Sequence, residues 1–186
     1  MMTETPELTI YEKAFARSDK TDAILVVDGK KLHVNKTLLS CHSDYFNTLF
    51  NSEFKEKSME EIEIKDVKFD DFATLLSLFH PKPFEITVGN AENLLKLADR
   101  FLLSNAKFQV EVFIKSSTEF NRYHKLLLSD KYNLENLFEH AIGLYESKES
   151  FSDFWLSMNR QFSDYSKARI FDRLFNLHGN AFFNWK

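Results

Sequence analysis

The chain has 186 residues, 44% of them hydrophobic and 28% charged, and its 24 basic and 28 acidic side chains give a formal net charge of −4. These values describe one folded domain, or one domain with a helical extension, and exclude disorder over the whole chain. The acidic balance argues against nucleic-acid binding, which needs a basic face. Only 4 glycines give little support to a phosphate-binding Gly-rich loop.

The cellular compartment is indicated by what the sequence lacks. Cys41 is the single cysteine, so an internal disulfide is excluded and a reducing environment is favoured. Residues 1–10 have no basic start and no apolar run, unlike a secretory signal. No stretch approaches the roughly 20 apolar residues of a spanning helix. We therefore expect a cytoplasmic or nuclear protein without a membrane partner.

The N-terminal third predicts a mixture of helices and strands. Apolar residues at helical spacing predict a short amphipathic helix over residues 8–17. Residues 22–34 carry the strongest strand signal, with Asp28-Gly29 as a hairpin turn, and the first strand is apolar on both faces. Residues 36–50 predict a helix that is interrupted near Ser43, which can cap a second helix.

Beyond a charged loop, the sequence predicts one more strand and then only helices. Residues 61–65 alternate between acidic and apolar side chains, as in a strand with one exposed face. Helices are expected from Phe69 onward, with Asn90 and Asn105 as candidate caps, and later over residues 117–129, 133–146 and 151–178. Gly179 is a candidate helix end. The order predicts an α+β domain followed by an α-helical extension.

Catalytic and metal-binding motifs are not found in the sequence. The six histidines do not form the H-E-x-x-H pattern of a zinc helix, and there is no nucleophile elbow or P-loop. The abundant carboxylates lack the apolar or Gly-rich setting of a general acid. We therefore expect no catalytic residue, no metal and no cofactor, and a function that depends on protein contacts.

One combination of segments resembles the BTB/POZ domain. It consists of residues 22–39, Ser43-Asp44-Tyr45-Phe46, residues 62–67 and residues 93–101. The match is closest to the BTB part of proteins that join a MATH domain to a BTB domain, although no MATH domain lies within these residues. It implies a three-stranded sheet flanked by helices. The expected domains are an N-terminal segment with a dimerisation helix (1–19), the BTB/POZ domain (20–116), a helical extension (117–178) and a tail (179–186).

The resemblance also implies a dimer. In such dimers an N-terminal helix packs against the partner, which assigns Ile10, Tyr11 and Phe15 to the interface. An acid that starts the first strand and a base that opens the next helix line a charged pocket near the two-fold axis. Those residues are Asp22 and Lys36 here, although Asn35 replaces the usual histidine. Asp22 could instead be a surface carboxylate at the start of the strand.

Many BTB proteins are adaptors of cullin-3 ubiquitin ligases, and these resemble one another in a hydrophobic-x-Glu motif. Phe54-Lys55-Glu56 has this pattern at the corresponding place, which assigns Phe54 and Glu56 to cullin binding, and Met59-Glu60-Glu61 is a weaker match. Phe54 could instead pack under its own loop. Residues 117–146 resemble the helical pair that widens the cullin contact, although any helical hairpin has the same periodicity.

The sequence thus leads to two hypotheses. The first is a dimeric adaptor that recruits an unknown substrate protein to a cullin-3-type ligase. The second is a scaffold that forms homodimers or pairs with related BTB proteins, without a ligase role. Residues 147–186 are rich in aromatic side chains, which either bind a substrate or pack on the preceding helices.

Overall fold

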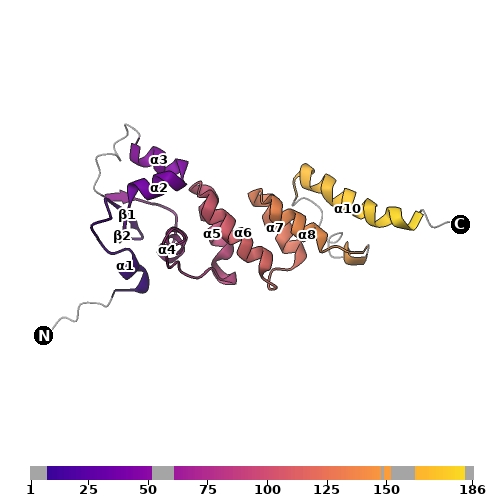
Figure 1. Cartoon of the computed structure of the whole chain (residues 1–186), viewed down its shortest axis with the longest axis horizontal. Coiled ribbons are helices and arrows are strands. Elements are labelled where there is room, and N and C mark those ends of the chain that lie inside the picture. The colour runs from indigo at the N-terminus through magenta and orange to yellow at the C-terminus, as the bar shows by residue number, and fades with distance from the viewer. Residues whose placement is uncertain (1–7, 52–60, 148, 152–161, 183–186) are drawn as a thin grey trace. The chain divides into compact units, whose positions relative to one another are not determined.

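The computed structural model describes residues 8–51, 61–147, 149–151 and 162–182, with side chains up to residue 177. The chain forms two compact units, residues 1–110 and 111–186. Figure 1 shows all strands of the described residues in the first unit and helices in the second. The expected α+β class with a helical extension is confirmed.

The sheet has the order β2-β1-β3 and is built around a hairpin. Strands β1 (Ala23–Val27) and β2 (Lys30–Val34) are antiparallel, with Leu25 opposite Leu32, and β3 (Glu61–Glu63) pairs with β1 in parallel. The turn residues Asp28 and Gly29 have φ angles of 48° and 73°. Both are left-handed, as a two-residue hairpin turn requires, so the predicted turn is confirmed.

The burial of β1 differs between its two faces. Leu25 and Val27 are fully buried, whereas Ile24 and Val26 are half-buried. The sequence suggested a strand buried on both faces, and the alternation shows that only one face is fully covered. Strand β3 ends at Glu63, two residues before the predicted end.

Among the described residues, five helices lie in the first unit and a sixth crosses its boundary at residue 110. They are α1 (Ile10–Ala14), α2 (Lys36–His42), α3 (Asp44–Asn51), α4 (Phe69–Ser77), α5 (Val88–Arg100) and α6 (Ser104–Ser116). The predicted interruption at Ser43 is confirmed, because its Oγ accepts from the Phe46 N–H at 3.1 Å and donates to the Phe101 carbonyl at 2.6 Å.

Two predicted caps are wrong. Helix α5 has Thr87 at its N-cap, and Asn90 is the third helical residue, whose Oδ1 accepts from the Thr87 N–H at 2.8 Å. In a capping box the third helical residue accepts a hydrogen bond from the backbone N–H of the N-cap residue. Asn90 has this role here, and Thr87 is the N-cap residue. Helix α6 begins at Ser104, so Asn105 lies inside it and not before it.

The core of the first unit is rich in phenylalanine. Phe101 lies at its centre, with its ring 5.8 Å from Phe46 and 5.1 Å from Phe72 between centroids. All three rings are fully buried. Burial of such a side chain contributes roughly 1.5–3 kcal/mol, so this cluster holds α3, α4 and α5 around the sheet.

The second unit is helical. It contains α7 (Arg122–Tyr132), α8 (Glu135–Gly143), the 3-10 turn η2 (Glu149–Phe151) and α10 (Asp164–Phe182). Helix α10 continues through Gly179, where the sequence suggested an end. An internal glycine costs about 0.5–1 kcal/mol relative to alanine, which a long helix tolerates.

Several helices are capped by carboxylates from other elements. Their first N–H groups have no partner within the helix and carry the positive end of its dipole. An oxygen of a remote carboxylate accepts from such a group at 2.7–3.1 Å in four cases. The pairs are Asp22 with Lys36, Asp28 with Phe69, Glu111 with Leu137 and Asp130 with Ser163.

Candidate functional site

Helix α1 presents an apolar surface to solvent. It begins with a capping box, in which the Glu12 carboxylate accepts from the backbone N–H and the hydroxyl of Thr9, both at 2.8 Å. These bonds lower the pKa of Glu12. Leu8 and Ile10 are 54% and 63% exposed at this end of the helix. The first residue of this short capped helix, Ile10, and Leu8 just before its N-cap are therefore two large apolar side chains in water.

The other two predicted interface residues of this helix contact their own chain. The Tyr11 ring lies edge-on to Phe84, with centroids 4.6 Å apart, and is half-buried. Phe15 is 2% exposed and its ring lies 4.8 Å from that of His80. Its carbonyl accepts from the His33 N–H of β2 at 3.0 Å. Phe15 therefore anchors α1, while Ile10 carries the exposed apolar surface.

Asp22 and Lys36 meet through the backbone. The Asp22 carboxylate accepts from the Lys36 N–H at 2.7 Å, and the Lys36 Nζ lies 5.9 Å from the centre of the Phe50 ring. The ion pairs found among the described residues do not include one between these two side chains. Asp22 therefore fixes the start of α2, and Lys36 remains half-buried beside an aromatic ring.

The sequence interpretation missed two features beside Asp22 and Lys36, namely the capping role of Asn35 and the exposure of Leu38. The Asn35 side chain accepts from the Leu38 N–H at 2.8 Å and donates to the Lys20 carbonyl at 2.9 Å. Asparagine is a preferred N-cap residue, so its place before Lys36 was an available signal. Leu38 is 36% exposed on α2, and nothing in its local pattern separates it from the buried Leu39.

The predicted cullin-binding residues Phe54 and Glu56 lie outside the described residues, and so do Met59 and Glu60. The assignment of Phe54 and Glu56 to cullin binding stays a prediction. The described chain around them places α3 before this segment and β3 after it.

The aromatic C-terminal region packs on the preceding helices where it is described. Phe151, Phe162 and Ile170 are buried in one cluster with residues of α7 and α8, including Leu126 and Phe138. This supports the packing alternative for these side chains. Phe154, Trp155, Phe183 and Trp185 lie outside the described residues.

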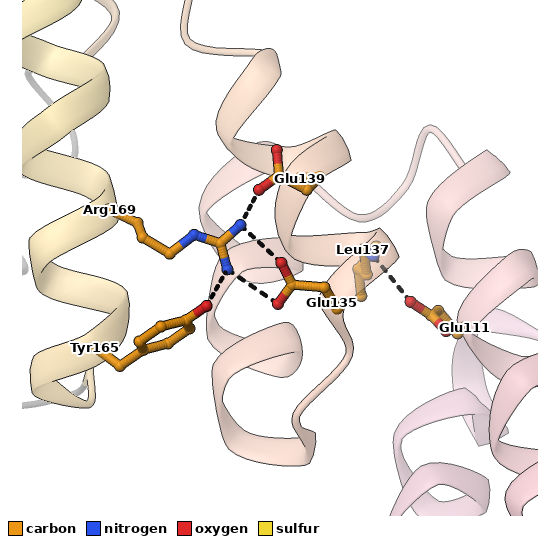
Figure 2. Close-up of polar contacts among 6 residues, drawn as sticks. All are labelled: Glu111, Glu135, Leu137, Glu139, Tyr165 and Arg169. Carbon is orange, nitrogen blue, oxygen red and sulfur yellow. Dashed lines mark hydrogen bonds and ion pairs between the residues drawn. The ribbon is translucent and has the colours of Figure 1, made fainter.

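Arg169 ties α10 to α8, as Figure 2 shows. Its guanidinium pairs with Glu135 at 2.8 Å and with Glu139, and it lies 4.3 Å from the centre of the Phe138 ring. The hydrogen bond and charge of Arg169 lower the pKa of Glu135. Tyr165 accepts from the same guanidinium at 3.3 Å.

Three aromatic side chains of α10 are exposed. Tyr165 and Phe175 are 67% and 69% exposed, and Phe171 is 36% exposed. Asp130 fixes the start of this helix, since its carboxylate accepts from the Ser163 N–H and hydroxyl at 2.8 and 2.5 Å. Burial alone would raise the pKa of Asp130, but hydrogen bonds from Ser163 and Ser166 outweigh it and lower the pKa.

The described residues contain no group of three or more histidine, cysteine, aspartate or glutamate side chains that could hold a metal ion. Of the same residues, no helix has the length and apolar character needed to cross a membrane. Large apolar side chains are exposed at α1, α2, α6 and α10, and those of α6 are Phe108 and Val112, 53% and 48% exposed.

The comparison with known proteins agrees with this fold. A BTB/POZ domain family model matches residues 11–118, and the chain belongs to this family. The family has a protein-interaction fold and is not an enzyme family. The chain therefore contains a protein-interaction module.

Relatives from Caenorhabditis elegans include BTB and MATH domain-containing protein 36, which is 34% identical over 129 residues, or 69% of this chain and 40% of that protein. BTB and MATH domain-containing protein 38 is 28% identical over 168 residues, or 90% of this chain and 43% of that protein. The chain spans less than half the length of these two relatives. The BTB domain of human gigaxonin matches 60% of this chain and 98% of its own, at 22% identity and a TM-score of 0.44.

Proposed function

We propose that the chain is a dimeric adaptor that recruits a substrate protein to a cullin-3-type ubiquitin ligase. The observation that carries this proposal is the exposed apolar end of α1 in a BTB/POZ domain, with Leu8 54% and Ile10 63% exposed. The likeness to BTB and MATH domain-containing proteins supports the adaptor role.

Dimerisation would cover the apolar surface at α1. A stable interface gains free energy mainly from its buried apolar anchors. Leu8 and Ile10 are such anchors, and Leu38 on α2 is a third in the same unit. The capping box and the buried Phe15 hold α1 in place before a partner binds. A helix that is already ordered loses less entropy on association.

Cullin binding is assigned to the segment between α3 and β3. In this proposal Phe54 fills an apolar groove of the cullin and Glu56 accepts hydrogen bonds. Loss of a buried aromatic anchor typically costs at least about 2 kcal/mol of binding energy. The mechanism is positional, because an adaptor raises the effective concentration of a substrate near the ligase and performs no chemistry.

The test is calorimetric titration of the cullin-3 N-terminal region into the intact chain. We expect the double variant Phe54→Ala/Glu56→Ala to lose binding while its circular dichroism and its mass in light scattering stay unchanged. The control Phe175→Ala removes an equally large aromatic side chain from α10, where it is 69% exposed, and should bind normally. Unchanged binding by the double variant would refute the assignment.

The same measurements separate the adaptor from the scaffold. A dimer that binds no cullin would leave only the oligomerisation role, as a homodimer or as a partner of related BTB proteins. The exposed end of α1 serves that role equally well.

A further inference from the structure

Ser163 joins two helices of the second unit through its hydroxyl group. It directly precedes α10, and its Oγ accepts from the Ser166 N–H at 3.2 Å while its carbonyl accepts from the Lys167 N–H at 3.0 Å. Serine is a preferred residue at this position. The same hydroxyl donates to the Asp130 carboxylate of α7 at 2.5 Å, and the Ser163 N–H donates to it at 2.8 Å. Ser163 therefore starts α10 and also ties it to α7.

Ser163 is accessible although its polar groups are engaged. Both Ser163 and Asp164 are exposed, whereas Ser166 is only 3% exposed. A hollow of about 330 Å³ lies beside Ser163, between the end of α7 and the starts of α8 and α10. A group added to the Ser163 oxygen therefore has space without displacing a buried side chain.

The sequence before Ser163 fits the substrates of arginine-directed kinases, which require an arginine three residues before the serine that they modify. Arg160 is at that position, and no other arginine of the chain has a serine or threonine three residues after it. Kinases select substrates by such patterns of charge. The structure describes Phe162 and Ser163 but not Arg160 and Gln161. The spacing and the exposure of Ser163 are thus two separate indications of a phosphorylated residue.

A phosphate on Ser163 would face a carboxylate that is already charged. Burial favours the neutral form of Asp130, but the hydrogen bonds from Ser163 and Ser166 outweigh it and lower the pKa of this carboxyl. Phosphoserine carries a charge of about −1.5 to −2 at neutral pH. It also lacks the hydroxyl proton that Ser163 now donates to Asp130. Phosphorylation would therefore replace a charge-assisted hydrogen bond by repulsion between two anions.

The cations of α10 near this contact already have partners. Lys167 pairs with Asp164 at 2.9 Å, and Arg169 pairs with two glutamates of α8. A phosphate at the start of α10 would still interact favourably with the positive end of that helix. Its effect therefore falls on the contact between α7 and α10 and not on the first turn of α10.

This contact borders the apolar cluster that holds α10 on the preceding helices. Phe162, which is adjacent to Ser163, and Ile170 are 4% and 2% exposed in this cluster, together with Leu126 of α7 and Phe138 of α8. When a polar anchor beside such a cluster is lost, the local opening of the segment costs less free energy. Phosphorylation would thus let α10 open more often and expose Phe162 and Ile170.

We propose that Ser163 is a phosphorylation site and that its modification by an arginine-directed serine kinase releases the start of α10 from α7. In the reaction the Ser163 oxygen forms a bond to the γ-phosphorus of ATP, and the bond from that phosphorus to the bridging oxygen breaks. ADP leaves, and the hydroxyl proton passes to the catalytic base of the kinase. The inference depends neither on cullin binding nor on the dimer.

The test treats the intact chain with ATP and a constitutively active fragment of calmodulin-dependent kinase II. We expect mass spectrometry to place one phosphate on Ser163 and none on Ser166. Arg160→Ala should lower the initial rate at Ser163 about tenfold or more. Hydrogen exchange of the α10 amides should become about tenfold or more faster after phosphorylation, as expected for the loss of a hydrogen bond to a charged group. The amides of the first unit should not change.

Two variants separate the proposed mechanism from a general effect of added charge. Asp130→Asn keeps an oxygen acceptor without the charge, so phosphorylation of this variant should speed α10 exchange by less than about threefold. Ser163→Asp should speed it in the unphosphorylated chain. The matched control Ser104→Asp adds the same charge at the exposed start of α6 and should leave α10 exchange unchanged. An unmodified Ser163, unchanged α10 exchange after phosphorylation, or an equal effect in Asp130→Asn would overturn the proposal.

Discussion

The Glu111 carboxylate lies 2.8 Å from the backbone nitrogen of Leu137 and accepts its hydrogen bond. Glu111 is only 6% exposed. Its partner Leu137 is the third residue of α8, whose own N-cap residue Leu134 supplies no side-chain acceptor. A buried charge is tolerated where it is hydrogen-bonded. Figure 2 shows this hydrogen bond between Glu111 and Leu137. The carboxylate also compensates the positive end of the helix.

We expect Glu111→Ala to lower the free energy of unfolding by about 1–3 kcal/mol, because it leaves the Leu137 N–H buried without its acceptor. Urea denaturation followed by circular dichroism measures this. Glu111→Gln keeps an oxygen acceptor and should lower the free energy of unfolding by less than Glu111→Ala does. An equal decrease in both variants would show that the oxygen of residue 111 has no role as a cap.

Arg169→Ala should loosen α10 without unfolding the first unit. The change removes ion pairs to Glu135 and Glu139 and the contact with the Phe138 ring. Because both carboxylates are well exposed, we expect a loss of only about 1–2 kcal/mol. Hydrogen exchange of the α10 amides should become faster. Arg169→Lys should recover part of the protection, since it restores charge but not the paired geometry.

The protein should become less stable as the pH falls below neutrality. Burial lowers the pKa of His80 from its ordinary value of 6.5, and burial with the charges of Lys125 and Lys115 lowers that of His140. The unfolded state therefore binds more protons than the folded state below about pH 6.5, and stability decreases there until the folded pKa is passed.

We expect His80→Gln to reduce this pH dependence, because glutamine does not titrate. The difference between the urea midpoints at pH 7.5 and pH 5.5 measures the pH dependence of stability in each protein. His140→Gln, which removes the other histidine with a lowered pKa, should reduce the pH dependence as well. A steeper loss of stability in His80→Gln would show that this histidine has a raised pKa in the folded state, contrary to expectation.

Ile10→Glu should disrupt the proposed dimer. A charge on a side chain that is 63% exposed costs the single chain little but is unfavourable in an apolar interface. Light scattering should report the mass of one chain, 21.9 kDa, and twice that value for the unmodified protein. A matched Thr48→Glu change on α3, also exposed, should leave the dimer intact. Equal masses for all three proteins would refute the interface.

The parts of the fold set by local chemistry could be predicted from the sequence. Asp28-Gly29 specifies a hairpin turn by its left-handed φ preference, and Ser43 separates two helices by its capping hydroxyl. The family resemblance gave the three-stranded sheet, which the structure confirms.

Features that depend on distant residues could not be predicted in this way. Glu111 and Leu137 are 26 residues apart, and no local pattern pairs them. The family resemblance assigned Phe15 to the dimer interface, but its ring is buried within its own chain beside that of His80, which comes far later in the sequence.

The central claim is that the chain joins a cullin to other proteins as a dimer. Its most direct test is size-exclusion chromatography with light scattering on a mixture of the intact chain and the cullin-3 N-terminal region. We expect a single complex whose mass equals two chains with two cullin fragments. Separate peaks at the masses of the free proteins would contradict the claim.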